Sequence, residues 1–235
     1  MTPQEAFNEL RTNTEYFLKY YPINIFGCPG PHHADQANTK QVYIHKRDPS
    51  APGSTPSKKV GHYGATRPGR TFSWRKHEIS SFKIQPANVA PAGVSRQLII
   101  AHSVPMHFEN TITINALDAY LLDNAQDGVM VTGQLSGCTF CVAPAGGNNL
   151  ACTHIKPVGA AGGGPLQTNL NNNGAFSTHP GPLTTFGRND YPAYATVIGV
   201  RAAGTWRIYA QCSNDQCKTI TSVYRIYPAP RHQIR

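Results

Sequence analysis

The chain has 235 residues, of which only 14% are charged, and it contains 21 Gly and 19 Pro. Its 21 basic and 12 acidic residues give a formal net charge of +9. This length suits one domain with its own core, so stability does not require a metal or a disulfide. No apolar run approaches the ~20 residues that a membrane-spanning helix needs. We therefore expect a single domain over residues 1–235, rich in short strands and turns.

The first predicted element is an N-terminal helix. Thr2 and Glu5 form a capping box, with Pro3 at the first helical position. Pro22 ends a run of apolar residues at roughly helical spacing, namely Ala6, Phe7, Leu10, Phe17 and Leu18. A basic segment followed by an apolar stretch is not visible here, so a Sec signal is not expected. Export would then use another route.

Residues 27–92 are rich in Pro and Gly and carry several Lys and Arg pairs. Within them we expect a mobile loop at about 48–58 and short strands at 41–44 and 71–74. The basic residues interleave with aromatic ones, a pattern compatible with nucleic-acid binding. Solvated loops explain the same pattern, so direct nucleic-acid binding is not favoured. A positive surface favours acidic partners in general, without choosing among them.

The second half of the chain is dominated by predicted strands. They cover residues 97–101, 129–132, 139–143, 151–155, 193–201, 205–212 and 219–227. A helix is predicted over 116–124, with Leu117, Tyr120 and Leu121 on one face. Residues 157–182 are rich in Gly and Asn, and we expect a flexible surface loop there, positioned to gate a site near His154.

Cys138 ends the run Leu-Ser-Gly-Cys at residues 135–138, between two predicted strands. Gly137 permits a sharp turn, and successive amides at Ser136, Gly137 and Cys138 can bind developing negative charge. His154 lies on the next predicted strand, where a hairpin would return it to the cysteine as a base. Thr132, on the strand before the turn, offers a hydroxyl to orient the imidazole. These are the parts of acyl-transfer chemistry.

The same residues admit other interpretations. Cys138, Cys141, Cys152 and His154 form a possible zinc ligand set, although the second half-site has only one intervening residue. Cys138 and Cys141 are spaced as a redox dithiol, but the residues after Cys138 do not predict the helix that such a motif normally opens. Buried structural cysteines are the third alternative. Cys212 and Cys217 are close enough in sequence to close a small disulfide loop.

The motif around Cys138 resembles a known family. Thr132, the Leu-Ser-Gly-Cys run and the pair His154-Ile155 resemble glutamine deamidases of the Burkholderia lethal factor type, a class that includes the catalytic domain of cytotoxic necrotizing factor. Residues 184–190 (Thr-Thr-Phe-Gly-Arg-Asn-Asp), running into 194–200, are also similar. The interval from cysteine to histidine is a few residues longer here, and residues 1–115 show no match.

The resemblance implies an α+β fold in which a β-sandwich of two mixed sheets is flanked by helices and long loops. It implies a hydrolase, a protein-glutamine deamidase without metal or cofactor. Cys138 would be the nucleophile, His154 the base and then the acid, and Thr132 the third site residue. Ser136 and Gly137 would support the oxyanion through the backbone.

The biological role implied is that of a bacterial toxin or effector acting in the host cytoplasm. Its implied substrate is a host RNA helicase of translation initiation, so that translation stops. We expect a monomer. The alternatives are a related transglutaminase or amidase and, from another class, a zinc-stabilised basic binding module.

Overall fold

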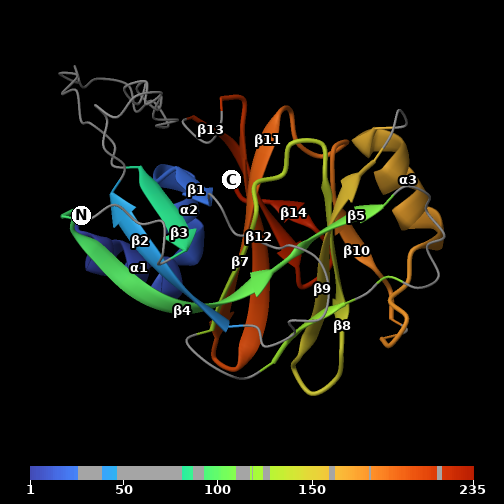
Figure 1. Cartoon of the computed structure of the whole chain (residues 1–235), viewed down its shortest axis with the longest axis horizontal. Helices are drawn as coiled ribbons and strands as arrows, with labels where there is room; N and C mark the ends of the chain where they lie inside the picture. Colours follow the sequence, from blue (N-terminus) through green and yellow to red (C-terminus); the bar gives the residue numbers. More distant parts are fainter. Residues whose placement is uncertain are drawn as a thin grey trace, which may run out of the picture.

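The computed structural model describes residues 1–25, 39–46, 81–86, 93–109, 117, 119–123, 128–158, 162–179, 181–215 and 219–235. Within them two β-sheets lie face to face (Figure 1). Helices α1 (Pro3–Thr12) and α2 (Thr14–Tyr20) cover the outer face of the larger sheet. Helix α3 (Gly163–Asn173) covers the outer face of the smaller sheet. The predicted α+β fold with a sandwich of two mixed sheets is confirmed.

In the described residues the larger sheet has nine strands, and it is mixed because it contains both parallel and antiparallel pairs. In spatial order the strands are β1 (Ile23–Ile25), β3 (Phe82–Pro86), β2 (Thr39–Lys46), β4 (Arg96–Val104), β7 (Val129–Thr132), β11 (Tyr194–Ala202), β12 (Thr205–Ser213), β13 (Ile220–Tyr227) and β14 (His232–Gln233).

Within the same described ranges the smaller sheet has five strands, and it is also mixed, with one parallel pair among antiparallel ones. Its main path runs β10 (Thr184–Phe186), β8 (Thr139–Pro144), β9 (Leu150–Pro157) and β5 (Met106–Glu109), and β6 (Tyr120–Leu122) pairs with β9. Strands β8 and β9 form an antiparallel hairpin.

Three apolar clusters hold these layers together. Phe17 and Phe82 belong to the cluster between α1, α2 and the larger sheet. Trp206 and Phe140 belong to the cluster between the two sheets. Leu166, with its neighbours, packs α3 onto the smaller sheet. Each such buried side chain contributes about 1.5–3 kcal/mol of transfer free energy. Strands β8 and β9 bury side chains on both faces, so the smaller sheet is packed between two apolar layers.

Most predicted strands are confirmed, and so is the capping box, in which Glu5 N–H donates to Thr2 Oγ1 at 3.2 Å. The N-terminal helix is interrupted at Asn13, whose φ of −139° is not helical. The predicted loop at 48–58 and the predicted strand at 71–74 lie outside the described residues.

Two predictions were wrong. Residues 157–182 do not form a structureless excursion, because they contain α3. Leu166 and Leu170 are four residues apart and both are buried, which gives this Gly/Asn-rich helix a narrow apolar face. The helix predicted over 116–124 was also wrong, since Tyr120–Leu122 is a strand. Pairing with β9 overrides the local helical pattern there.

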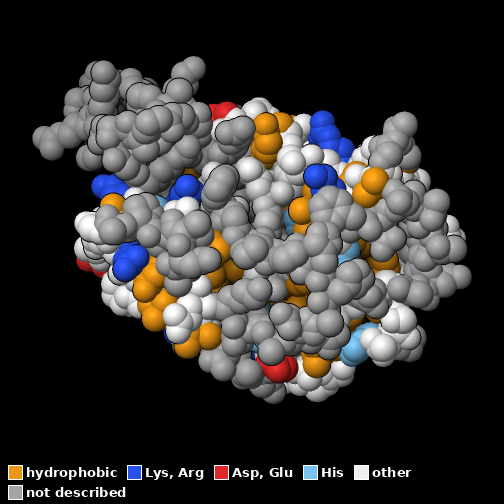
Figure 2. Space-filling view, viewed as in Figure 1, with side chains coloured by type: hydrophobic (Ala, Val, Ile, Leu, Met, Phe, Trp, Pro, Cys, Tyr) orange, Lys and Arg blue, Asp and Glu red, His pale blue; other side chains and the backbone are white. Residues whose placement is uncertain are grey.

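On the one face that Figure 2 draws, the positive charge of the described part is dispersed. On the face shown in Figure 2, the Lys and Arg side chains coloured there lie over several elements and do not gather into one patch. In the part of the chain that the structure describes, no helix is both long and apolar enough to cross a bilayer.

Candidate active site

Cys138 lies where the chain crosses from the larger sheet to the smaller one. Thr132 is the last residue of β7, and Cys138 immediately precedes β8. The β8–β9 hairpin then brings back His154, which pairs with Phe140. Cys138 and Phe140 belong to the cluster between the sheets, and the predicted return of His154 by a hairpin is confirmed. His154 therefore lies across the hairpin from Phe140, two residues beyond Cys138.

Thr132 and His154 form a hydrogen-bonded pair that fixes the imidazole tautomer. The Thr132 hydroxyl donates to the carbonyl oxygen of Val104 at 2.9 Å. It therefore has no second hydrogen to give, so the 2.9 Å contact between Thr132 Oγ1 and His154 Nδ1 requires Nδ1 to donate. A neutral His154 then carries its lone pair on Nε2. That is the arrangement a general base needs.

His154 Nε2 is buried and, among the described residues, has no hydrogen-bond partner. The Cys138 thiol consequently does not donate to it in this state. The ring lies beside Gly133, where an added Cβ would be 3.8 Å from His154 Cε1. A buried lone pair without a hydrogen-bond donor lowers the stability of the folded state. A substrate, or a small movement of the Cys138 thiol, would supply the missing donor.

Burial keeps both groups neutral. It lowers the pKa of His154 to about 3, with a smaller contribution from the charge of His107. It raises the pKa of the Cys138 thiol, while a backbone hydrogen bond from Ser136 and the charge of Lys156 act in the opposite direction. Since Cys138 is 3% exposed and His154 0%, this is a closed resting state. Formation of a thiolate–imidazolium pair requires the site to open or a substrate to enter.

The buried histidine predicts a pH-dependent stability. Between pH 6.5 and about 3 the unfolded chain binds a proton at His154 that the folded chain does not. The free energy of unfolding should therefore fall as the pH is lowered through this window, by up to about 1.4 kcal/mol per pH unit from this group. Urea unfolding at a series of pH values gives the free energy of unfolding of the wild type and of His154→Gln. Plotted against pH, the two free energies should have different slopes below pH 6.5 and the same slope above pH 7. The same pH dependence of the free energy of unfolding in both proteins, over the whole pH range, would contradict the burial of a neutral imidazole.

Two amides of the Cys138 turn, those of Ser136 and Gly137, are already engaged. Gly137 has a φ of +112°, which favours glycine, and its N–H donates to the Tyr191 hydroxyl at 2.7 Å. The Ser136 backbone amide interacts with the Cys138 sulfur. The sequence predicted these amides as oxyanion donors. In this state a substrate oxyanion would have to displace Tyr191 to reach the Gly137 amide.

The four residues of the proposed zinc set do not converge. Cys138 and Cys152 belong to the cluster between the sheets, whereas Cys141 belongs to the cluster under α3, on the other face of the smaller sheet. Within the described ranges, no group of three or more His, Cys, Asp or Glu side chains is placed to hold a metal ion. The redox pair fails for the same geometric reason, and Cys141 lies in a strand rather than a helix. The expected pairing of the buried Cys212 with Cys217 lies outside the described residues, since Cys217 is not among them.

Sequence reasoning missed the side chains that support the Cys138 turn. Tyr191 contacts it directly, and Arg188 donates to the carbonyl oxygens of Tyr191 and Pro192 at 2.6 and 2.7 Å. Gln167, from the segment expected to be a loop, is buried against the same region. Arg188 and Asp190, two opposite charges close together in a chain with few charges, were the available signal.

The comparisons with known proteins add no relative: no protein-family model matches the chain, and no curated protein matches it.

Proposed function

We propose that this chain is a protein-glutamine deamidase that acts through a cysteine thioester. The observation that carries the proposal is the hydrogen-bonded series from Val104 O through Thr132 Oγ1 to His154 Nδ1, which leaves Nε2 as the basic nitrogen. Cys138 lies on the same inter-sheet side of the hairpin. The proposed nucleophile, base and orienting group thus come from the Cys138 turn, strand β9 and strand β7. Acyl transfer requires the thiol within hydrogen-bond reach of Nε2, so the closed resting state must rearrange before the reaction.

In the proposed reaction the Cys138 thiol gives its proton to His154 Nε2, and the sulfur attacks the side-chain carbonyl carbon of a substrate glutamine. The tetrahedral intermediate collapses as His154 protonates the departing nitrogen, which leaves as ammonia. A water molecule, deprotonated by His154, then attacks the thioester and releases glutamate and the free thiol. Each backbone donor that binds the oxyanion supplies roughly 3 kcal/mol.

The biological context rests on the resemblance of the Leu-Ser-Gly-Cys and histidine motif to the lethal factor type of deamidase. On that basis we propose a bacterial toxin or effector that acts in a host cytoplasm and blocks translation. An RNA helicase of translation initiation is the proposed substrate. The excess of basic residues would favour encounter with an acidic surface.

Turnover is the appropriate test, because a buried thiol with a raised pKa would react slowly with alkylating reagents even in an active enzyme. The purified protein should be incubated with a eukaryotic translation extract, followed by peptide mass spectrometry and an ammonia assay. We expect conversion of a specific glutamine to glutamate, and loss of translation. A parallel incubation with a labelled primary amine separates the reactions, since incorporation of the amine would indicate a transglutaminase. Absence of both glutamate and amine products would refute the proposal.

A further inference from the structure

The Tyr191 side chain spans the turn that carries Cys138. Its hydroxyl accepts from Gly137 N–H at 2.7 Å and donates to the carbonyl oxygen of Cys138 at 3.0 Å. One phenolic oxygen therefore binds the backbone N–H of Gly137 and the backbone carbonyl of Cys138, which lie on either side of the peptide bond between these two residues. Burial raises the pKa of Tyr191, so the hydroxyl keeps the proton that it donates.

Tyr191 is itself held from two directions. Arg188 Nη1 donates to the Tyr191 carbonyl oxygen at 2.6 Å, and the Arg188 guanidinium carbon lies 5.7 Å from the centre of the tyrosine ring. On another side the ring stacks with Phe186, with 6.0 Å between ring centres. With its ring and backbone both fixed, Tyr191 has little freedom to rotate away from the Cys138 turn.

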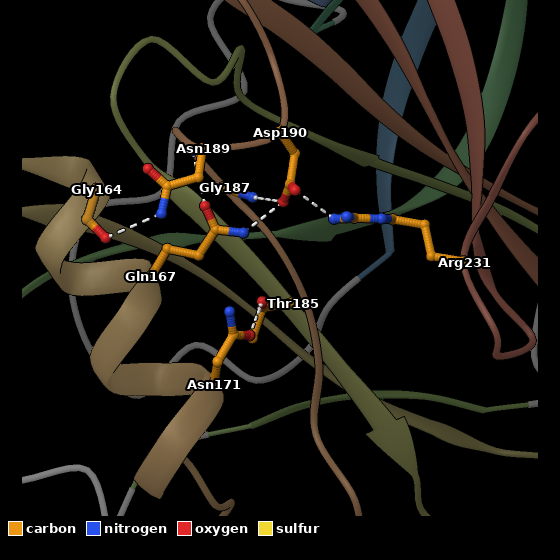
Figure 3. Close-up of polar contacts among 8 residues, drawn as sticks. All are labelled: Gly164, Gln167, Asn171, Thr185, Gly187, Asn189, Asp190 and Arg231. Carbon is orange, nitrogen blue, oxygen red and sulfur yellow. Dashed lines mark hydrogen bonds and ion pairs between the residues drawn. The ribbon is translucent and has the colours of Figure 1, made fainter.

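Polar contacts join the turn at residues 187–190, which precedes Tyr191, to Gln167 of α3 and to Arg231 near the C-terminus (Figure 3). The Gln167 side-chain oxygen accepts from Asn189 N–H at 2.8 Å, and its nitrogen donates to the Asp190 carboxylate. The same carboxylate accepts from Gly187 N–H at 3.0 Å and pairs with Arg231 at 2.5 Å. Because Asp190 and Gln167 are largely buried, this network holds the turn as a rigid unit.

We propose that Tyr191 is a positioning residue for the Cys138 nucleophile, acting through the backbone of residues 137–138. It does not touch the reacting atoms. Its hydroxyl fixes the exit angle of the turn and so keeps the sulfur on the side of the hairpin that carries His154. This inference rests on the proposed deamidase function, in which an error of about 1 Å in the nucleophile costs up to ~100-fold in rate.

The test compares Tyr191→Phe with Tyr209→Phe, in the full-length chain. Tyr209 is a matched control because it is also buried and its hydroxyl also has a polar neighbour, Glu15, at 3.5 Å. It belongs to the separate apolar cluster beneath α1 and α2. For Tyr191→Phe we expect kcat to fall by roughly 10- to 100-fold with KM nearly unchanged. Tyr209→Phe should keep kcat. Thermal unfolding establishes that both variants are folded at the assay temperature.

Hydrogen exchange of the Gly137 amide provides a second readout that does not depend on activity. It should become faster in Tyr191→Phe and stay unchanged in Tyr209→Phe. Unchanged exchange in Tyr191→Phe, or faster exchange with an unaltered kcat, overturns the positioning role. A higher kcat would mean that Tyr191 competes with the oxyanion for the Gly137 amide, which also overturns it. A wild-type protein that shows no turnover while its Gly137 amide is protected refutes the deamidase proposal and leaves the contact intact.

Discussion

Replacing Cys138 by alanine is expected to abolish deamidation, with a loss of at least about 10⁴-fold in kcat/KM, while the protein stays folded. The reason is that in the proposed reaction the Cys138 sulfur forms the thioester. Among the described cysteines, Cys138 is the one in the turn held by Tyr191. The measurement is the rate of ammonia release from the substrate, with peptide mass spectrometry of the product.

Cys141→Ala provides the matched control for this experiment. Cys141 is also a buried thiol in the same segment, but it packs under α3, on the opposite face of the smaller sheet. The two variants remove the same atoms from comparable surroundings, so their losses of stability should be similar. Turnover should survive only in Cys141→Ala. Activity retained by Cys138→Ala would remove Cys138 as the nucleophile.

The second large effect is expected at Gly163, the first residue of α3. A Cβ there would overlap the carbonyl oxygen of Gly137 and lie 2.9 Å from Arg188 Cβ. Gly163→Ala must therefore push the start of α3 away from the Cys138 turn. We expect a loss of about 1–3 kcal/mol in the free energy of unfolding, together with reduced turnover. Urea unfolding and the ammonia assay measure the two consequences.

Gly164→Ala tests whether the effect comes from this close approach or merely from adding a methyl group to the helix. At Gly164 the nearest atom to an added Cβ is Oδ1 of Asn189, at 3.0 Å, which is the end of a side chain able to shift. Alanine is favoured over glycine in helices by up to about 1 kcal/mol, so Gly164→Ala should be neutral or stabilising. Equal destabilisation by both variants would contradict a tight contact between Gly163 and the turn.

The strands were predictable because their apolar residues are consecutive in the chain and are bounded by Gly, Pro and Asn. The β8–β9 hairpin is an example, since residues 139–143 and 151–155 flank a turn rich in Gly and Asn. Helix α3 was not predictable in the same way. Only Leu166 and Leu170 mark its buried face, and its remaining residues are typical of loops. Tertiary packing against the smaller sheet, rather than helix propensity, stabilises it.

By itself the sequence determined the sheet-rich class of the fold and the candidate trio Thr132, Cys138 and His154, because each rests on residues close together in the chain. Only the tertiary structure decided how these groups are connected. The direction of the Thr132 hydrogen bonds depends on Val104, from a neighbouring strand, and the form of the Cys138 turn depends on Tyr191. Both contacts join segments distant in sequence, and burial between two sheets sets the protonation of His154. Local patterns carry no signal for such effects, since they arise only when separate strands are packed together.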